Sequence, residues 1–249
     1  MNSAAKDCRA TAAAPTLVQR LAALDWRRIA RDLDASGSAV LERQLPPADC
    51  QQLRRAYAER ALFRSRVVMS QHGFGSGEYQ YFTYPLPQLV ATLRRELYLH
   101  LAPLANRWQG QLGQSMRYPR EHAQFLARCR AAGQALATPL LLKYGSGDYN
   151  CLHQDLYGES VFPLQVAFLL SRPGEDFGGG EFVVTEQRPR RQSRAEVVPL
   201  RQGDAVVFAV RERPMRGTRG SYRVNLRHGV SRVRWGERYT LGVIFHDAR

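Results

Sequence analysis

The chain of 249 residues contains no long apolar run, and this shortage excludes a class of protein. No stretch approaches the roughly 20 consecutive apolar residues that a membrane-spanning helix needs. The amino-terminal residues also lack the continuous apolar core of a secretory signal. We therefore expect no membrane association, and we expect residues 1–16 to be flexible.

Cysteine is also scarce, which argues against a disulfide scaffold and against a zinc finger. No two cysteines form a C-x-x-C pair. The four positions are Cys8, Cys50, Cys129 and Cys151. A chain without structural disulfides suits a reducing compartment, so a cytoplasmic location is predicted.

Lysine occurs only at Lys6 and Lys143, so almost all positive charge comes from arginine. The formal net charge is +14, and 14 arginines lie from Arg188 to Arg238 inclusive. This balance favours a polyanionic partner, above all nucleic acid. An excess of arginine and alanine can equally reflect genomic base composition, in which case the charge is only a solvated surface. The composition leaves both alternatives open.

The hydrophobic pattern divides the chain near Thr138. Before this residue, apolar side chains recur at helical spacing, which predicts helices over 17–35, 46–60, 88–109 and 119–135. A short strand is expected before the second helix. Residues 71–87 are rich in glycine and aromatic residues and are typical of a long loop or an irregular hairpin.

After Thr138 the pattern changes to seven short β-rich runs separated by glycine and proline turns. No helical pattern lies between them. The fold class predicted is α+β, mainly β: a double-stranded β-helix, or jelly roll, with an N-terminal helical layer. We expect a single domain over 17–249, in which 17–137 forms the helical support and a lid region and 138–249 forms the jelly-roll core.

A His-x-Asp pair in this half suggests a metal site. If residues 151–155 are extended, His153 and Asp155 project to one side of the strand. Imidazole and carboxylate suit Fe(II), and a second histidine would complete the facial triad of non-heme iron oxygenases. His228, at the end of a strand-like run, is the best-placed third ligand. The other histidines are expected to be a loop residue (His72), two structural helix residues (His100, His122) and an exposed or capping residue (His246).

Arg238 and Thr240 follow His228 at a spacing that suits a cosubstrate site. The intervening WGE predicts a turn, so that the two flanking strands pair and return Arg238 to the neighbourhood of His228. A guanidinium in that position can bind a carboxylate with two hydrogen bonds, and the Thr240 hydroxyl can add another. The other end of a dicarboxylic cosubstrate would then chelate the metal.

The combination of H-x-D, a histidine about 75 residues later and R-x-T ten residues further on resembles the Fe(II)/2-oxoglutarate dioxygenases. LLKYGSGDYNCLHQD and GGGEFVV resemble their prolyl-hydroxylase-like branch, which implies that Tyr144 helps to hold 2-oxoglutarate. From about residue 35 to the end, HQDLYGESVFPLQVAFLLS and YRVNLRHGVSR are similar to a bacterial family of nucleic-acid oxygenases that oxidatively demethylate damaged DNA. The resemblance implies Fe(II), 2-oxoglutarate and O2 as cofactors.

The resemblance leads us to expect a dioxygenase that demethylates alkylated DNA and releases succinate, CO2 and formaldehyde. Tyr81, in an aromatic lid, would stack on a base, and Arg190 and Arg191 would contact phosphates. One alternative is a hydroxylase of a protein, of the prolyl type, or of a small molecule, which would use the same iron centre. Another is a non-catalytic β-barrel that binds nucleic acid through its arginines. The oligomeric state cannot be predicted from the sequence.

Overall fold

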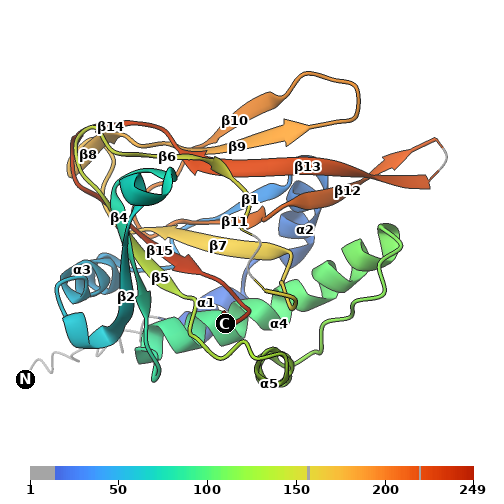
Figure 1. Cartoon of the computed structure of the whole chain (residues 1–249), viewed down its shortest axis with the longest axis horizontal. Coiled ribbons are helices and arrows are strands. Elements are labelled where there is room, and N and C mark those ends of the chain that lie inside the picture. The colour runs from blue at the N-terminus through green and yellow to red at the C-terminus, as the bar shows by residue number, and fades with distance from the viewer. Residues whose placement is uncertain (1–14, 156–157, 219) are drawn as a thin grey trace, which may run out of the picture.

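Two antiparallel β-sheets face each other, and helices cover the outer side of the larger one (Figure 1). This computed structural model describes residues 15–155, 158–218 and 220–249. The segment predicted to be flexible, 1–16, lies almost wholly outside the described residues. The paired sheets with a helical layer confirm the predicted jelly roll.

The larger sheet has seven strands in the order β1-β11-β7-β15-β5-β4-β2. Their bounds are β1 Ser38–Leu41, β11 Ala205–Ala209, β7 Leu164–Leu169, β15 Arg238–Val243, β5 Leu140–Tyr144, β4 Glu78–Phe82 and β2 Phe63–Val68. In the middle of this sheet, all six residues of β7 are buried. A strand buried on both faces must pack against two layers, here the helices on one side and the second sheet on the other.

The smaller sheet has six strands, ordered β10-β9-β13-β6-β3 with β12 also paired to β13. Their bounds are β10 Arg194–Val198, β9 Phe182–Gln187, β13 Gly220–Val230, β6 Tyr149–His153, β3 Gly75–Ser76 and β12 Glu212–Gly217. β8 (Phe177–Gly179) and β14 (Val233–Gly236) pair to form a separate two-stranded sheet. The β9–β10 and β12–β13 hairpins point to the same side of the molecule (Figure 1).

Five α-helices precede or flank the sheets in the described chain. They are α1 Leu17–Ala22, α2 Trp26–Ser36, α3 Pro47–Ala56, α4 Gln88–Gln111 and α5 His122–Ala131, with short 3-10 turns η1 Arg60–Leu62 and η2 Met69–His72. The predicted helix over 17–35 is two helices, because the Asp25 carboxylate accepts a hydrogen bond from the Arg28 backbone N–H (2.9 Å) and so starts a new one. The helix predicted over 119–135 is shorter than expected.

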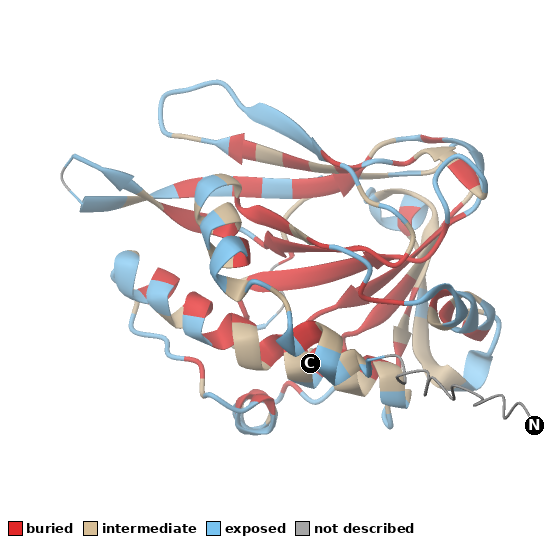
Figure 2. Cartoon of the chain, turned by 180° about the vertical axis from the view of Figure 1, so that it is seen from behind, coloured by how far each residue is buried: buried red, intermediate tan, exposed pale blue. Residues whose placement is uncertain are grey.

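The main hydrophobic core contains residues from both halves of the chain, from Leu21 of α1 to Phe245 beyond β15. Figure 2 shows the buried positions concentrated on the inner strands and on the side of α4 that faces them. The division into one domain over 17–249 stays a prediction.

Several strands were not predicted from the sequence. Eleven strands, β5 to β15, follow Thr138 in the described chain, four more than the seven β-rich runs, and β2 was missed as well. The strands without a β-rich run of their own, β6, β8, β12 and β14, contain polar residues, glycine or proline, and β6, anticipated only as the extended segment 151–155, has no buried position. Strands of this kind lack the apolar signal on which a prediction depends.

The prediction that His246 is an exposed or capping residue is wrong. His246 is fully buried, and its Nδ1 accepts a hydrogen bond from the Phe162 backbone N–H (3.2 Å). The reason is Arg94 of α4, which donates hydrogen bonds to the backbone oxygens of Ile244 (2.8 Å) and His246 (3.0 Å) and to the Asp247 carboxylate (2.8 Å). These bonds hold the carboxyl-terminal residues inside the protein.

Among the described helices, none combines the length and the apolar character that crossing a bilayer requires.

Candidate metal centre and its cavity

His153, Asp155 and His228 converge between the two sheets. One ligand atom from each lies within 4.8 Å of the others. His153 ends β6 and faces His228 of β13 in the strand pairing, and their ring centroids are 4.2 Å apart. The Nε2 atoms of His153 and His228 lie 3.2 Å and 3.4 Å from opposite oxygens of the Asp155 carboxylate. The sequence thus predicted the three residues that the fold brings together.

The protonation of the cluster suits a cation. Burial by itself would raise the pKa of Asp155, but hydrogen bonds with the two imidazoles outweigh burial and lower the pKa, so the carboxylate is charged. The His153 Nδ1 lies 2.8 Å from the Cys151 carbonyl oxygen. An Nδ1–H donated there would hold the ring in place, and a metal would take the Nε2 position that bonds Asp155 in this structure; an outer hydrogen bond of this kind is usual for a histidine ligand.

A cavity of about 280 Å³ lies beside the cluster. Its floor is the inner face of the larger sheet, where the strand register sets the side chains in rows. The first row pairs Tyr144 with Arg238, and the second runs Tyr79, Leu142, Thr240 and Leu169. The third row runs Tyr81, Leu140, Gly242 and Ala167, and the fourth pairs Gln165 with Phe208. Successive rows are about 6.6 Å apart, because two residues of a strand rise about that much.

Arg238 is the charged residue of the first row. It is 2% exposed, yet it makes no ion pair with any described residue. Its Nη1 donates to the Thr240 hydroxyl (2.6 Å), while its Nε has no hydrogen-bond partner. Burial lowers the pKa of the guanidinium to about 10, so it stays charged at neutral pH. A buried, charged and incompletely bonded guanidinium on a cavity wall is suited to a carboxylate ligand.

Tyr144 lies across from Arg238 in the adjacent strand. The guanidinium carbon is 5.6 Å from the centre of the phenol ring, and the Asn150 amide donates to the hydroxyl (3.3 Å). Burial raises the pKa of Tyr144 to about 12, so the hydroxyl stays protonated and can donate a hydrogen bond into the cavity. Gly180 of the GGGE turn packs on the other side, where an added Cβ would come within 2.9 Å of the Arg238 Cδ.

The predicted pairing of the strands around WGE is wrong. His228 lies on β13 in the smaller sheet and Arg238 on β15 in the larger sheet, so they do not form a hairpin. The segment between them forms β14, which pairs with β8 instead. Both residues still line the same cavity, because they face each other across the space between the sheets.

The predicted substrate contacts divide into two groups. Tyr81 lines the cavity, and the guanidinium carbon of Arg64 lies 4.6 Å from the centre of its ring. Arg190 and Arg191 are exposed in the loop between β9 and β10, and neither lines the cavity. The structure therefore places one of the three at the candidate site and two on a projecting hairpin.

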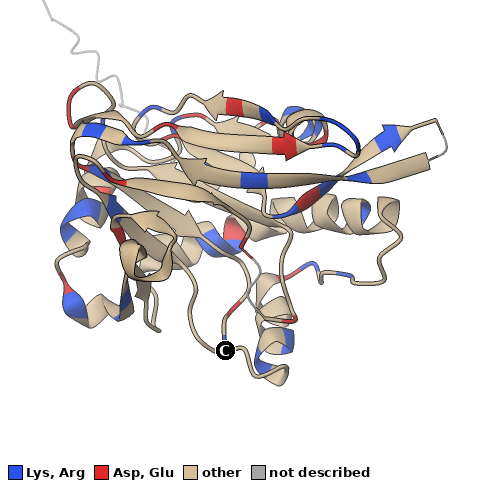
Figure 3. Cartoon of the chain, turned by 45° about the horizontal axis from the view of Figure 1, so that its top comes forward, with Lys and Arg blue, Asp and Glu red and all other residues tan. Residues whose placement is uncertain are grey.

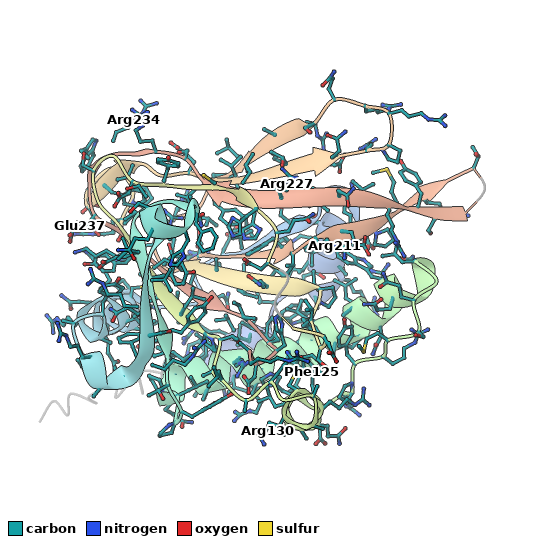
Figure 4. The ribbon with its side chains drawn as sticks, in the orientation of Figure 1. Phe125, Arg130, Arg211, Arg227, Arg234 and Glu237 are labelled. Atoms are coloured by element: carbon teal, nitrogen blue, oxygen red, sulfur yellow. The ribbon has the colours of Figure 1, made fainter. Side chains whose placement is uncertain are left out.

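Two further arginines lie close to the cavity and were not singled out in the sequence. Gln154, a cavity residue, donates hydrogen bonds to the backbone oxygens of Arg211 (3.1 Å) and Leu226 (2.8 Å). Arg211 and Arg227, the residue after Leu226, are both exposed. Figure 4 labels both, Arg227 on β13 of the smaller sheet and Arg211 between the layers. Only the folded structure reveals their position, because one arginine among 14 carries no signal in the sequence.

Comparison with known proteins agrees with this geometry. Residues 77–248 match the model of a family described as "Oxygenase, catalysing oxidative methylation of damaged DNA". The match covers more than half of the chain, including every residue of the triad and Arg238. The chain belongs to this oxygenase family. The resemblance had been expected from about residue 35, and the match begins later, at the loop before β4.

Two proteins of Mycobacterium tuberculosis, from strains CDC 1551 and H37Rv, are each 50% identical to this oxygenase over 167 residues. Each alignment covers 67% of this chain and 72% of the relative. Both relatives are described only as uncharacterized proteins, so they add support for the family and none for a substrate.

Solved structures share the fold of this oxygenase at low sequence identity. A prolyl-4-hydroxylase of Pseudomonas putida is 15% identical, with a TM-score of 0.51, over 90% of this chain and 99% of its own. A 2-oxoglutarate–Fe(II) oxygenase family protein of Burkholderia pseudomallei is 16% identical, with a TM-score of 0.52, over 91% and 93%. A Trichoplax adhaerens prolyl hydroxylase, solved with a peptide of hypoxia inducible factor, is 14% identical, with a TM-score of 0.51, over 87% and 86%.

Family, fold and side chains together identify a 2-oxoglutarate-dependent oxygenase, an oxidoreductase whose cofactors are Fe(II), 2-oxoglutarate and O2. Two observations of this chain fit those groups. His153, Asp155 and His228 supply the donor set of a facial triad. Arg238 supplies a buried cation with unused hydrogen-bonding capacity.

Proposed function

We propose that this oxygenase removes methyl groups from alkylated bases of nucleic acid, DNA in particular. The observation that carries the proposal is a charged surface around an oxygenase cavity. Between residues 186 and 230, Glu196 is the only exposed acid in the described chain, whereas exposed arginines lie on both projecting hairpins and on β13. The exposed arginines are Arg190, Arg191, Arg194, Arg201, Arg211, Arg216, Arg223 and Arg227.

This surface lies on the smaller sheet, next to the cavity. Figure 3 shows Lys and Arg positions on β13 and on the two hairpins. On β13, His228 points into the cavity and Arg227 away from it, because adjacent residues of a strand face opposite ways. A strand of nucleic acid on the outer face would lie across the sheet from the oxidising centre, so its target base would have to turn out of the strand to enter the cavity. Arginines are suited to contacting its phosphates, which fix position without reading sequence.

Within the cavity, His153, Asp155 and His228 would hold Fe(II). Arg238, with Thr240 and Tyr144, would hold the far carboxylate of 2-oxoglutarate. When bound, these groups supply O2 activation coupled to the oxidative decarboxylation of 2-oxoglutarate to succinate and CO2. The apolar residues of the second and third rows would exclude water from the reacting carbon, and Tyr81 would stack on the base.

Oxygenase chemistry permits demethylation, and the description of the family, which names damaged DNA, favours it over hydroxylation of a peptide. One oxygen atom of O2 enters the succinate and the other enters the C–H bond of an N-methyl group. The hydroxymethyl product then breaks its N–C bond and leaves as formaldehyde, which restores the N–H of the base. The balance is one O2 and one 2-oxoglutarate consumed for one succinate, one CO2 and one formaldehyde released.

The direct test uses iron-loaded protein and a set of methylated single- and double-stranded oligonucleotides. Formaldehyde and succinate should form in equal amounts, above the succinate released without substrate. Asp155→Ala should abolish both products without unfolding the protein, because it removes one ligand and leaves the apolar strands intact. His246→Gln is the control at a buried histidine that is not a ligand. If a proline-containing peptide stimulates turnover and no methylated DNA or RNA does, the prolyl-type alternative is correct.

A second test concerns the arginine surface. Binding of an oligonucleotide should weaken with salt by about 0.7 to 0.9 log units per log unit of salt for each phosphate contacted. Arg211→Glu with Arg227→Glu, beside the cavity, should lower the affinity more than Arg190→Glu with Arg191→Glu on the hairpin. Neither pair should change substrate-free turnover of 2-oxoglutarate. If neither double substitution nor added salt changes the affinity, the excess of arginine reflects genomic composition and not nucleic-acid binding. The cytoplasmic location stays a prediction.

A further inference from the structure

Gln165 is the polar residue at the end of the cavity opposite Arg238. It lies in the fourth row of the floor, paired with Phe208 of β11. The next residue, Val166, pairs with Val243, five positions along β15 from Arg238. This separation corresponds to about 17 Å along the strand. Gln165 is therefore too far from Arg238 to share a ligand carboxylate with it.

The Gln165 side chain lacks the hydrogen bonds that a buried amide needs. The residue is 5% exposed and lines the cavity, and its Nε2 has no hydrogen-bond partner. Buried amide groups are nearly always bonded, because an unsatisfied one lowers the stability of the fold. A glutamine kept in this state is accounted for if a ligand supplies the missing partner.

The surroundings of Gln165 define the chemistry of that ligand. Among the described residues that line the cavity, the only ionisable groups besides tyrosine and cysteine are the triad and Arg238. The fourth row otherwise offers the flat ring of Phe208, and the third row offers the small residues Gly242 and Ala167. This end of the cavity suits an uncharged, flat group with a polar edge.

The same end of the cavity lies next to the triad. The centroids of the Phe208 and His228 rings are 4.4 Å apart. Gln165, as the strand partner of Phe208, is thus one side chain removed from a candidate metal ligand. A group whose edge contacts the Gln165 amide would present its substituents to the oxidising centre.

We infer that Gln165 is a specificity-determining residue, whose amide hydrogen-bonds the polar edge of the base that enters the cavity. The inference rests on the proposed function, which supplies the base. An amide offers a donor and an acceptor side by side, and this pair matches the adjacent acceptor and donor on a base edge. Bases extruded from a strand are read in this way, by hydrogen bonds to the edge and by stacking on the face.

The test compares Gln165→Met with Gln44→Met. Methionine approximates the volume of glutamine but cannot form the amide hydrogen bonds. Gln44 is also buried, at 4% exposure, and lies outside this cavity; its Oε1 has no partner, but its Nε2 donates to the Glu42 carbonyl oxygen (2.7 Å). Gln165→Met should lower kcat/KM for a methylated oligonucleotide about 10- to 100-fold. It should leave Tm equal to the wild type or higher, whereas Gln44→Met should lower Tm and leave kcat/KM unchanged.

Iron affinity and substrate-free 2-oxoglutarate turnover distinguish contact with the base from a role of Gln165 in positioning the metal ligands. Both should be unchanged in Gln165→Met, and a fall in either would mean that Gln165 positions the metal ligands, which overturns the inference. A lower Tm with kcat/KM within twofold of wild type would make the residue structural and overturns it too. If the wild-type protein acts on no methylated nucleic acid, the proposed function fails by itself. In that event, an unchanged or raised Tm of Gln165→Met would still support an amide that binds some other ligand. A lowered Tm of this variant would show that Gln165 is structural.

Discussion

Arg94 and Arg238 are both buried arginines, and they differ in what surrounds them. Arg94 donates hydrogen bonds to five oxygens, on Tyr84, Thr138, Ile244, His246 and Asp247. Arg238 donates to the Thr240 hydroxyl, and its Nε has no partner. The first guanidinium is fully used by the fold, so its contribution is to stability. The second retains an unpaired donor beside a cavity, at a cost to stability, which agrees with the ligand-binding role that we propose for it.

The largest effect is expected from removing Arg94. Arg94→Met leaves the buried Asp247 carboxylate without its cation and frees the carboxyl-terminal backbone. The free energy of unfolding should fall by about 3–5 kcal/mol. Urea denaturation checks this value. At a temperature where the variant is still folded, its half-saturation for 2-oxoglutarate should match the wild type, and a large increase would show that the two arginines are not separate in function.

Arg238→Met should have the opposite effect, a loss of 2-oxoglutarate binding without a loss of stability. Loss of a buried, charge-assisted contact should weaken 2-oxoglutarate binding by about 2–5 kcal/mol, while iron affinity stays nearly constant. Stability should not fall, because the native guanidinium has few bonds to lose. Titration of succinate formation against 2-oxoglutarate, together with thermal unfolding, measures both quantities. An unchanged half-saturation would place the carboxylate anchor on a different residue.

Acid should lower the stability of the fold through the two buried histidines near Arg94. Burial and the nearby Arg94 lower the pKa of His122 to about 3 and that of His246 to about 4. The unfolded chain binds these protons near pH 6.5 and the folded chain does not, so stability is lost as the pH falls below 6.5. At pH 5 each histidine should account for about 2 kcal/mol of that loss. His122→Gln should start less stable at pH 7.5 and lose less on acidification, and equal losses in both proteins would contradict the assignment.

The smallest effect is expected at Thr240. Its hydroxyl accepts a hydrogen bond from Arg238 and lines the cavity. Thr240→Val keeps the shape and removes the hydroxyl, so 2-oxoglutarate affinity should fall by about 1 kcal/mol, less than with Arg238→Met. Competition with a dicarboxylate inhibitor such as N-oxalylglycine gives an independent measure of the same contact. An effect as large as that of Arg238→Met would make Thr240 the principal anchor.

The comparison of the two arginines also shows what sequence can predict. Arg238 was identified because its spacing from His228 and its R-x-T motif follow a known pattern. Arg94 was not, because it lies in a predicted helix and its partner Asp247 is 153 residues away. Because the partner that Arg94 needs for burial is so distant in sequence, the residues around Arg94 do not predict that it is buried. His246 lies near the chain end, which predicts exposure, but hydrogen bonds from the equally distant Arg94 hold this segment inside the protein.

The cavity shows the same limit. The triad was predicted from residue types and spacing, and its members are brought together by two strands of one sheet. Gln165 went unnoticed inside an apolar run, although a single polar residue in a fully buried strand is itself a signal. The rows of the floor depend on register between strands up to about 100 residues apart, and register is set by the packing of the whole sheet.

The alternation along β13 has a consequence for protein engineering. Residues 224, 226 and 228 are buried, and residues 223, 225 and 227 are exposed. The first set packs inside the protein, where His228 lines the cavity, and the second set faces outward. The proposed nucleic-acid contact could therefore be altered at residues 223, 225 and 227, while residues 224, 226 and 228 keep the core and the candidate metal ligand unchanged.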